Sequence, residues 1–300
     1  MPSPGQYCSY SPAQLTLHAH LIRYTLAYLL PQVPKALALS RYSNRFGDSL
    51  ATATAHVDNS VKVHSAPPGR RYDHYFFSGM ALLILASVFL GFAHTYYLAG
   101  VFHAPLPSRI IHIHGAVFST WILLLITQTS LVAAGRVDIH RRLGIAGFLL
   151  ACLMIILGVL AATEALSRPN SPTGLDVKTF YIIPMTDMLI FAVLVFFAFR
   201  ARFNPSAHKR IILIATIGIM IAAISRWPFS MVNRKPLVAA LLSYGFLLLL
   251  SAYDLWSTRK IHRATIWASA FLIIVQQIRF PIGQTAAWHS FATWAQSLGR

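Results

Sequence analysis

Seven long runs of apolar residues follow one another along most of the chain, with short polar segments between them. A helix needs about 20 apolar residues to cross the hydrocarbon core of a bilayer, and several of these runs approach that length. The pattern therefore predicts an all-α fold, an integral membrane bundle of about seven transmembrane helices within residues 72–281. The expected spans are 74–98, 110–134, 143–165, 180–199, 211–229, 237–256 and 264–280.

The two ends of the chain lack this pattern. Residues 1–71 hold scattered proline, serine, histidine and basic residues without a sustained period, so we expect a disordered tail, or upstream sequence included through a misplaced start. At the other end, apolar side chains recur at steps of three and four residues at Trp288, Phe291, Trp294 and Leu298. This spacing predicts that residues 282–300 form a short amphipathic helix on the membrane surface.

After the first span, the other six spans form three hairpins whose turns are rich in basic residues. Three similar hairpins indicate an internal repeat, and membrane proteins often place functional sites near the axis that relates such repeats. The alternative interpretation is the general excess of Lys and Arg at cytoplasmic helix ends. The bend signatures are His140-Arg141-Arg142, His208-Lys209-Arg210 and His262-Arg263, and two hairpins close on Arg226-Trp227-Pro228 and Arg279-Phe280-Pro281.

Composition supports a membrane protein, because 56% of the residues are hydrophobic and only 11% are charged, against about a quarter in soluble proteins. The formal net charge of +17 is distributed over the segments between spans, without a contiguous basic face, which argues against nucleic-acid binding. Such charges fit contact with the lipid bilayer and its anionic lipid headgroups. Since most basic residues flank the three bends, we expect the bends and the N-terminus to be cytoplasmic.

Histidines gather at the opposite ends of the spans. His94 lies near the end of the first span, and His112 and His114 begin the second at similar depth. A haem held by two histidines needs one from each of two facing helices, so these residues are candidate ligands for haem b or a transition metal, with Asp187 or Glu164 as an oxygen ligand. His112 and His114 point about 200° apart on a helix, so only one can face a given neighbour. The alternative is that these histidines are interfacial and hydrogen-bonded.

Ionisable residues inside the spans are the other candidates, because they are costly in a bilayer and often mark pathways or sites. Asp187 lies a few positions into the fourth span, and Arg226 or Arg279 could pair with it if the fifth or seventh span packs nearby. Glu164 is a further pathway or ion-pair candidate. Asp254, near the end of the sixth span, is expected to pair with a basic residue of the loop that follows it.

The residues around the first bend carry a resemblance. This part of the chain resembles a group of uncharacterised bacterial multi-pass membrane proteins. The resemblance rests on three features: the pattern His-x-His-Gly, a span ending in Gln-Thr-Ser-Leu, and the segment Gly-Arg-Val-Asp-Ile-His-Arg-Arg-Leu-Gly. The similarity covers about residues 72–294 and brings no established activity or site. It implies a location in the bacterial inner membrane. The bend more loosely resembles membrane domains of unknown function allied to cytochrome-b-type and oxidase-assembly proteins. The matching residues are His112, His114, Gly115, Gln128, Gly135, Arg136, Asp138, His140, Arg141, Arg142, Leu143 and Gly144.

These observations lead to one leading functional hypothesis and two alternatives. The leading hypothesis is a haem- or metal-binding membrane protein that handles redox chemistry or a cofactor through His94, His112 and His114. The first alternative is a small-solute or proton-coupled transporter, which the hairpin repeat and Asp187 favour. The second alternative is a membrane scaffold or sensor without catalysis. An enzyme of lipid metabolism has less support, because no paired acidic motif occurs in the sequence.

Overall fold

The computed structural model describes residues 72–105, 107–171 and 174–298. By its internal contacts, the second of two units of the chain, Val63–Arg300, contains all of the described residues. The expected N-terminal tail therefore lies outside the described residues. Every element named below belongs to the second unit.

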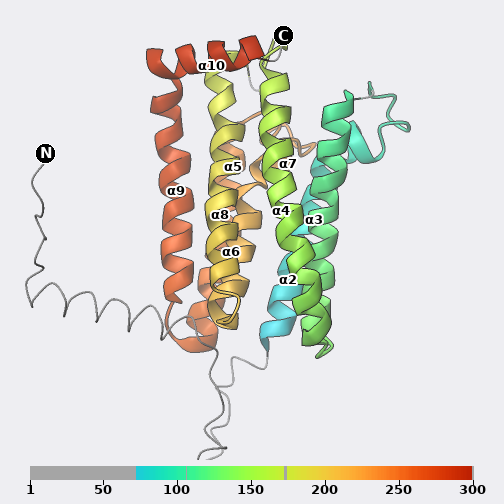
Figure 1. Ribbon diagram of the computed structural model, residues 1–300, viewed down its shortest axis with the longest axis vertical. Helices are drawn as coiled ribbons and strands as arrows, with labels where there is room; N and C mark the ends of the chain where they lie inside the picture. Colours follow the sequence, from blue (N-terminus) through green and yellow to red (C-terminus); the bar gives the residue numbers. More distant parts are fainter. Residues whose placement is uncertain (1–71, 106, 172–173, 299–300) are drawn as a thin grey trace, which may run out of the picture. The chain divides into compact units, whose positions relative to one another are not determined.

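The described residues form helices joined by turns and loops, and seven helices are long and apolar enough to cross a membrane (Figure 1). This confirms the predicted all-α bundle of seven spans. A short final helix, α10, lies across one end of the bundle, which we call the α10 end. The opposite end, which holds the α3–α4, α5–α6 and α8–α9 turns, is called the bend end. The helices are α2 (Asp73–Phe92), its π-helical continuation η2 (Ala93–Tyr97), α3 (Arg109–Ala133), α4 (Val137–Ala165), α5 (Val177–Arg200), α6 (Pro205–Gly218), α7 (Ile221–Ile224), α8 (Pro236–Thr258), α9 (Arg263–Gly283) and α10 (Ala286–Leu298).

Several helices begin where the sequence supplies a capping residue. The carboxylate of Asp176 accepts hydrogen bonds from the backbone N–H groups of Lys178 and Thr179 at the start of α5. At the start of α6, the side chain of Asn204 caps the helix and Pro205 follows at its first position. These residues satisfy or avoid backbone donors that an isolated helix end leaves unpaired, which fixes where each helix starts.

The structure revises the predicted bends. The first bend was expected to be a turn through residue 142, but α4 already begins at Val137, and α6 begins at Pro205 rather than near residue 211. His140 and His208 are consequently each the fourth residue of a helix. His262 differs from both because it precedes α9 as its N-cap. The three bend signatures are therefore similar in sequence and only two of them are equivalent in structure.

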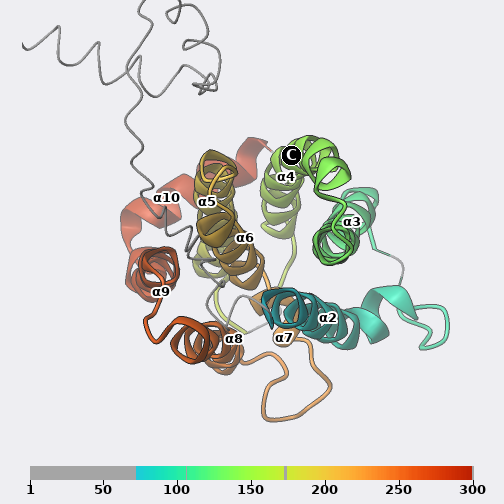
Figure 2. The ribbon, with the colours of Figure 1, turned by 90° about the horizontal axis from the view of Figure 1, so that it is seen from below.

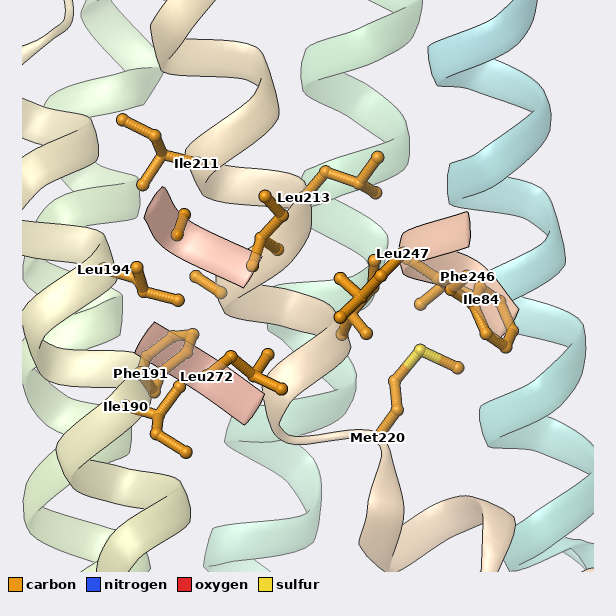
Figure 3. Packing of buried hydrophobic residues seen from close by; sticks show 14 of the residues in the cluster. Ile84, Ile190, Phe191, Leu194, Ile211, Leu213, Met220, Phe246, Leu247 and Leu272 are labelled. Atoms are coloured by element: carbon orange, nitrogen blue, oxygen red, sulfur yellow. The ribbon is translucent and has the colours of Figure 1, made fainter. Parts of the chain in front are cut away.

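The helix α6 lies at the centre of the bundle (Figure 2), and α5 packs against it and against α4 and α9. The buried side chains of α5 and α6 form one apolar cluster with α2, α8 and α9, to which Phe191, Ile214 and Leu250 contribute with no exposed surface (Figure 3). Many large apolar side chains on the outer spans, among them Leu149 and Leu248, are exposed instead. Exposed apolar surface of this extent is suited to contact with lipid.

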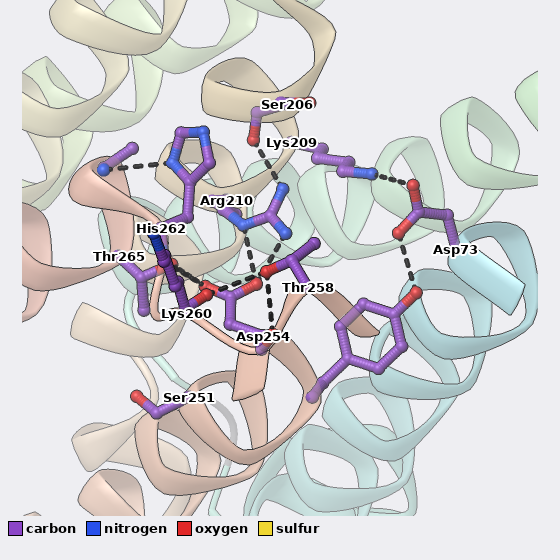
Figure 4. Close-up of polar contacts among 12 residues, drawn as sticks. Asp73, Ser206, Lys209, Arg210, Ser251, Asp254, Thr258, Lys260, His262 and Thr265 are labelled. Carbon is purple, nitrogen blue, oxygen red and sulfur yellow. Dashed lines mark hydrogen bonds and ion pairs between the residues drawn. The ribbon is translucent and has the colours of Figure 1, made fainter. Parts of the chain in front are cut away.

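A buried ion pair joins α6 to α8 at the bend end (Figure 4). The Nε and Nη2 atoms of Arg210 donate to Oδ1 of Asp254 at 2.9 and 2.5 Å, and Nη1 donates to the carbonyl oxygen of Ser206 at 2.8 Å. The other carboxylate oxygen accepts from the Thr265 hydroxyl at 2.6 Å and from the backbone N–H of His262 at 3.1 Å. The expectation that Asp254 pairs with a residue of its own loop is thus wrong, because its partner comes from α6.

This Arg210–Asp254 network continues to α2 through Asp73. One carboxylate oxygen of Asp73 accepts from the Lys209 ammonium at 2.5 Å, and the other accepts from the Tyr253 hydroxyl at 2.7 Å. Figure 4 shows the Lys209 side chain directed toward this carboxylate. The bend end is therefore held by a polar network whose charged groups have partners from four helices.

The start of α9 depends on an uncharged histidine. The Nδ1 atom of His262 accepts a hydrogen bond from the backbone N–H of Ala264 at 3.1 Å, which only the neutral ring can do. Burial, and after it the positive charge of Arg210, lower the pKa of His262 below 6.5. The cap is therefore present above about pH 6.5 and is lost as the pH falls through the lowered pKa.

We expect this cap to make the protein sensitive to acid in a way that one substitution removes. The variant His262→Asn retains a capping side chain that does not titrate. Between neutral pH and pH 5, the wild type should lose about 1 kcal/mol more of its free energy of unfolding than the variant does. Unfolding in mixed detergent micelles at a series of pH values measures the difference. Parallel pH profiles for the two proteins would contradict this role.

Candidate functional site: a cationic cavity at the α10 end

Two cavities lie near opposite ends of the bundle. The cavity at the α10 end has a volume of about 650 Å³ and is lined by α2, η2, α3, α4, α5 and α7 together with the loops before α5 and α8. The cavity at the bend end measures about 460 Å³ and is lined by α2, α3, α4, α5 and α6. Both volumes fall in the range of small-molecule sites in proteins. The distribution of charge distinguishes the two cavities.

The α10-end cavity is strongly cationic. Arg168, Arg226 and Arg234 line it, and Asp187 is the only acid among its described lining residues. Within the described part of the chain, no carboxylate lies within 4.0 Å of any of these three guanidinium groups. The cavity therefore concentrates positive charge that protein carboxylates leave uncompensated.

Close packing between α2 and α7 positions Arg226. A Cβ atom on Gly91 would overlap the backbone of Ala223, so only glycine permits this approach. The indole N–H of Trp227 donates to the carbonyl oxygen of Ser87 in α2 at 3.0 Å. Because Arg226 lies between these two contacts in sequence, its backbone is fixed at the wall of the cavity.

The guanidinium of Arg226 has neutral partners only. Its Nη1 donates to the carbonyl oxygen of Ala222 at 2.5 Å, and the group lies 5.0 Å from the ring centroid of Phe92. Desolvation by the surrounding protein, and after it the positive charge of Arg168, lower the pKa of Arg226. Both causes act against the charged form, but Arg226 is exposed, so the repulsion from Arg168 is the cause that a bound anion would offset.

A second buried ion pair lies beside the cavity. The Nη1 atom of Arg279 in α9 donates to Oδ1 of Asp187 in α5 at 2.8 Å, and Arg279 is one of the two arginines that the sequence offered as its partner. Arg279 is completely buried, yet its Nε and Nη2 atoms have no partner among the described residues. One helical turn earlier, the amide nitrogen and oxygen of the buried Gln276 also have no hydrogen-bond partner among the described residues. Such orphan groups are rare in protein interiors and call for water or a ligand.

The three histidines predicted as ligands separate in the structure. His94 and His114 both line the α10-end cavity, whereas His112 is exposed and outside the lining, with its backbone carbonyl accepting from the Tyr96 hydroxyl. The ring of His94 stacks on the ring of Phe102, with 3.6 Å between the two ring centroids. His114 is half-buried, and its Nδ1 atom has no hydrogen-bond partner.

The other predicted residues are placed as follows. Glu164 is half-buried outside the cavity lining, with its Oε2 atom unpartnered. Across the described segments, no group of three or more His, Cys, Asp or Glu side chains is arranged to hold a metal ion. At the bend end, His140 and His208 line the second cavity, while Arg141 and Arg142 are exposed and outside it. The structure thus brings His114 and Asp187 to one cavity and leaves His112 apart from them.

Sequence reasoning missed Arg168 and Arg234 as site residues. Both lie in loops that join spans, at Ser167-Arg168-Pro169 and Asn233-Arg234-Lys235, where basic residues are ordinary. The left-handed backbone of Arg234, with φ of 60°, is also invisible in the sequence. Comparison with protein-family models, with curated proteins and with solved structures found no match for this chain. The functional argument therefore rests on the cavity itself.

Proposed function

We propose that this integral membrane protein binds an oxyanion, a phosphate or carboxylate group, in the cationic cavity at the α10 end. The observation that carries the proposal is the set of three lining arginines without a described carboxylate partner. Such an oxyanion could belong to a free solute or to the headgroup of an anionic lipid. Both present the same charged oxygens to the guanidinium groups.

The energetics favour this class of ligand. The three arginines are exposed and lie between the spans, where their like charges face one cavity, so a bound anion would offset their mutual repulsion. The planar guanidinium presents donors in a fork that matches the oxygens of carboxylate and phosphate groups. Each hydrogen bond between charged partners is worth about 1.5–3 kcal/mol. A guanidinium can donate to two oxygens of one oxyanion at the same time, whereas chloride offers a single acceptor atom.

The remaining polar groups of the cavity fit the same ligand. The ring of His114 has a hydrogen bond with the backbone of Leu157, so its Nδ1 atom, which has no partner among the described residues, can donate to an oxyanion when both ring nitrogens carry protons. Asp187 would repel an anion, but Arg279 neutralises it and retains two unpaired donors behind it. The earlier hypothesis of haem or metal ligation by His94, His112 and His114 stays a prediction. The oxyanion proposal requires only residues that line the cavity.

We further propose that the bend end is cytoplasmic and that the protein resides in a bacterial inner membrane. The excess of Lys and Arg around the bends supports this orientation. The α10 end and its cavity then face the opposite side of the membrane. A ligand would enter from that side, or laterally from the outer leaflet if it is a lipid.

The variant Arg226→Gln tests the proposed function. Inorganic phosphate at constant ionic strength should raise the thermal unfolding midpoint of the detergent-purified wild type, because a ligand stabilises the state that binds it. Removing one charged donor pair should weaken phosphate binding about 10- to 100-fold. In a second arm, the same unfolding midpoint is measured in nanodiscs with phosphatidylglycerol in place of phosphate. A separate measurement of phosphate uptake into proteoliposomes tests transport.

Arg109→Gln is the matched control, because Arg109 is an exposed arginine near the same end of the bundle and does not line the cavity. It should leave the response to both probes unchanged. Stabilisation by phosphatidylglycerol alone would identify a lipid headgroup as the source of the oxyanion. If neither probe stabilises the wild type in a way that Arg226→Gln removes, the binding function is wrong and a scaffold without a ligand becomes the better hypothesis.

A further inference from the structure

The two equivalent bend histidines meet inside the bend-end cavity. His140 and His208 occupy the same position in α4 and α6, and their ring centroids lie 6.3 Å apart with the ring planes 85° to one another. Both side chains are among the residues that line the cavity. Two helices that start at the same end of the bundle therefore deliver two imidazoles to one space.

The hydrogen bonds of these rings leave nitrogen lone pairs available. Nδ1 of His208 lies 2.8 Å from the carbonyl oxygen of Ala198, and because a carbonyl only accepts, this nitrogen carries the proton. The Nε2 atom of the neutral ring then holds a lone pair. A bond from one ring nitrogen to a backbone carbonyl is the usual arrangement that orients a metal-binding histidine. The Nδ1 atom of His140 is buried and has no partner.

A third group beside the two rings is also incompletely bonded. The amide Nε2 of Gln128 donates to the backbone carbonyl oxygen of His140 at 3.3 Å, which holds the side chain against the start of α4. Its Oε1 atom is buried without a partner among the described residues. Packing of the two histidines against one another leaves the orphan atoms of His140 and Gln128 without partners, and since buried polar atoms are nearly always bonded, these atoms call for water or a ligand.

The cavity around the histidines is mostly apolar and aromatic, with Phe77, Trp121, Phe148 and Phe199 in its lining. At about 460 Å³ it is larger than a bare ion needs. Lys209 lies at its edge, where its ammonium pairs with Asp73. An apolar space lined by imidazoles and aromatic rings, with the paired charges of Lys209 and Asp73 in its lining, would suit an amphipathic metal cofactor such as haem.

We propose that His140 and His208 coordinate a metal centre, either the iron of a haem or a single transition-metal ion. Two imidazoles on opposite sides of one metal have ring centroids roughly 6 Å apart, because metal–nitrogen bonds are about 2.0–2.1 Å long. The observed centroid separation of 6.3 Å agrees with this value. This site is at the other end of the bundle from the oxyanion cavity, and neither proposal depends on the other.

Absorbance and metal analysis of the full chain test the site. The protein is purified in detergent from haem-replete cells, and one portion is then titrated with haem and another with zinc or copper ions. A Soret band with the spectrum of six-coordinate low-spin iron supports haem ligation. Stoichiometric metal without a Soret band supports the bare ion. Absence of both from the purified and the titrated protein would overturn the proposal.

The variants His140→Ala and His208→Ala connect either signal to this pair. Loss of a direct ligand should weaken binding more than ~100-fold, since loss of an outer-shell partner already costs 10- to 100-fold. His112→Ala, an exposed histidine at the opposite end, is the control and should keep full occupancy. Added imidazole should restore the spectrum of His208→Gly, which separates lost ligation from failed folding. A double variant that folds and still binds stoichiometrically would overturn the assignment.

Discussion

Replacing Asp254 with alanine is expected to lower the free energy of unfolding by about 3–5 kcal/mol, because the substitution leaves the buried charge of Arg210 without its partner. Arg210 has an exposed fraction of 3% and Asp254 of 0%, so neither group can recover its lost interactions from water. The same change removes the acceptor of the Thr265 hydroxyl and of the backbone N–H of His262. Three helices would lose a common contact.

Unfolding of the purified variant in mixed micelles of increasing denaturing detergent measures this loss. Asp138→Ala is the matched control, since Asp138 pairs with Arg136 at 3.9 Å with both side chains more than half exposed. Exposed pairs of this kind are worth about 0–1 kcal/mol. Similar losses for the two variants would show that the Arg210–Asp254 network does not hold the bend end together.

The spans were predictable from sequence because lipid imposes a simple condition on them. A window of about 20 apolar residues satisfies it without reference to any other part of the chain. The starts of helices were less predictable, since local caps decide them. Asn204 and Pro205 start α6 inside a segment that reads as a polar loop, and the interruption of the fifth span after Gly218 leaves no clear mark in its apolar sequence.

Ion pairs between distant helices depend on packing that composition does not reveal. The pairing of Asp187 with Arg279 could be anticipated because both are isolated charges at similar depth. Asp254 had several basic residues nearby in sequence, and these suggested a local partner. The structure selects Arg210, which is 44 residues away, because α6 presents its guanidinium to α8, where two of its nitrogens donate to one oxygen of the Asp254 carboxylate.

The candidate sites also depend on packing between helices, which the sequence does not reveal. The histidine pattern of the bends was visible, but the meeting of His140 with His208 follows from where α4 and α6 begin. His262 shares the signature and instead caps a helix. For the cationic cavity, Arg168 and Arg234 come from separate loops and converge only when the spans pack. Residue types that are ordinary in their local sequence can form a site by convergence alone.

The variant Asp187→Asn is expected to lose about 3–5 kcal/mol in a buffer free of oxyanions, because the completely buried Arg279 then lacks its only charged partner. Asp187 borders the α10-end cavity, so a ligand in the cavity can approach the unpaired guanidinium. Phosphate should therefore stabilise the variant more than it stabilises the wild type. At about 100 times its dissociation constant, phosphate would contribute about 2.7 kcal/mol.

Asp254→Asn supplies the comparison that separates a binding site from a structural ion pair. It also leaves a buried arginine unpaired, but neither Arg210 nor Asp254 lines a described cavity. Both variants should be destabilised, and phosphate should rescue only Asp187→Asn. The rescue is read from unfolding midpoints over a phosphate series, with sodium chloride at equal ionic strength to exclude general screening. An equal response in the two variants would mean that phosphate acts outside the cavity. A selective response would place the oxyanion beside Arg279, because access from the cavity is what distinguishes one buried arginine from the other.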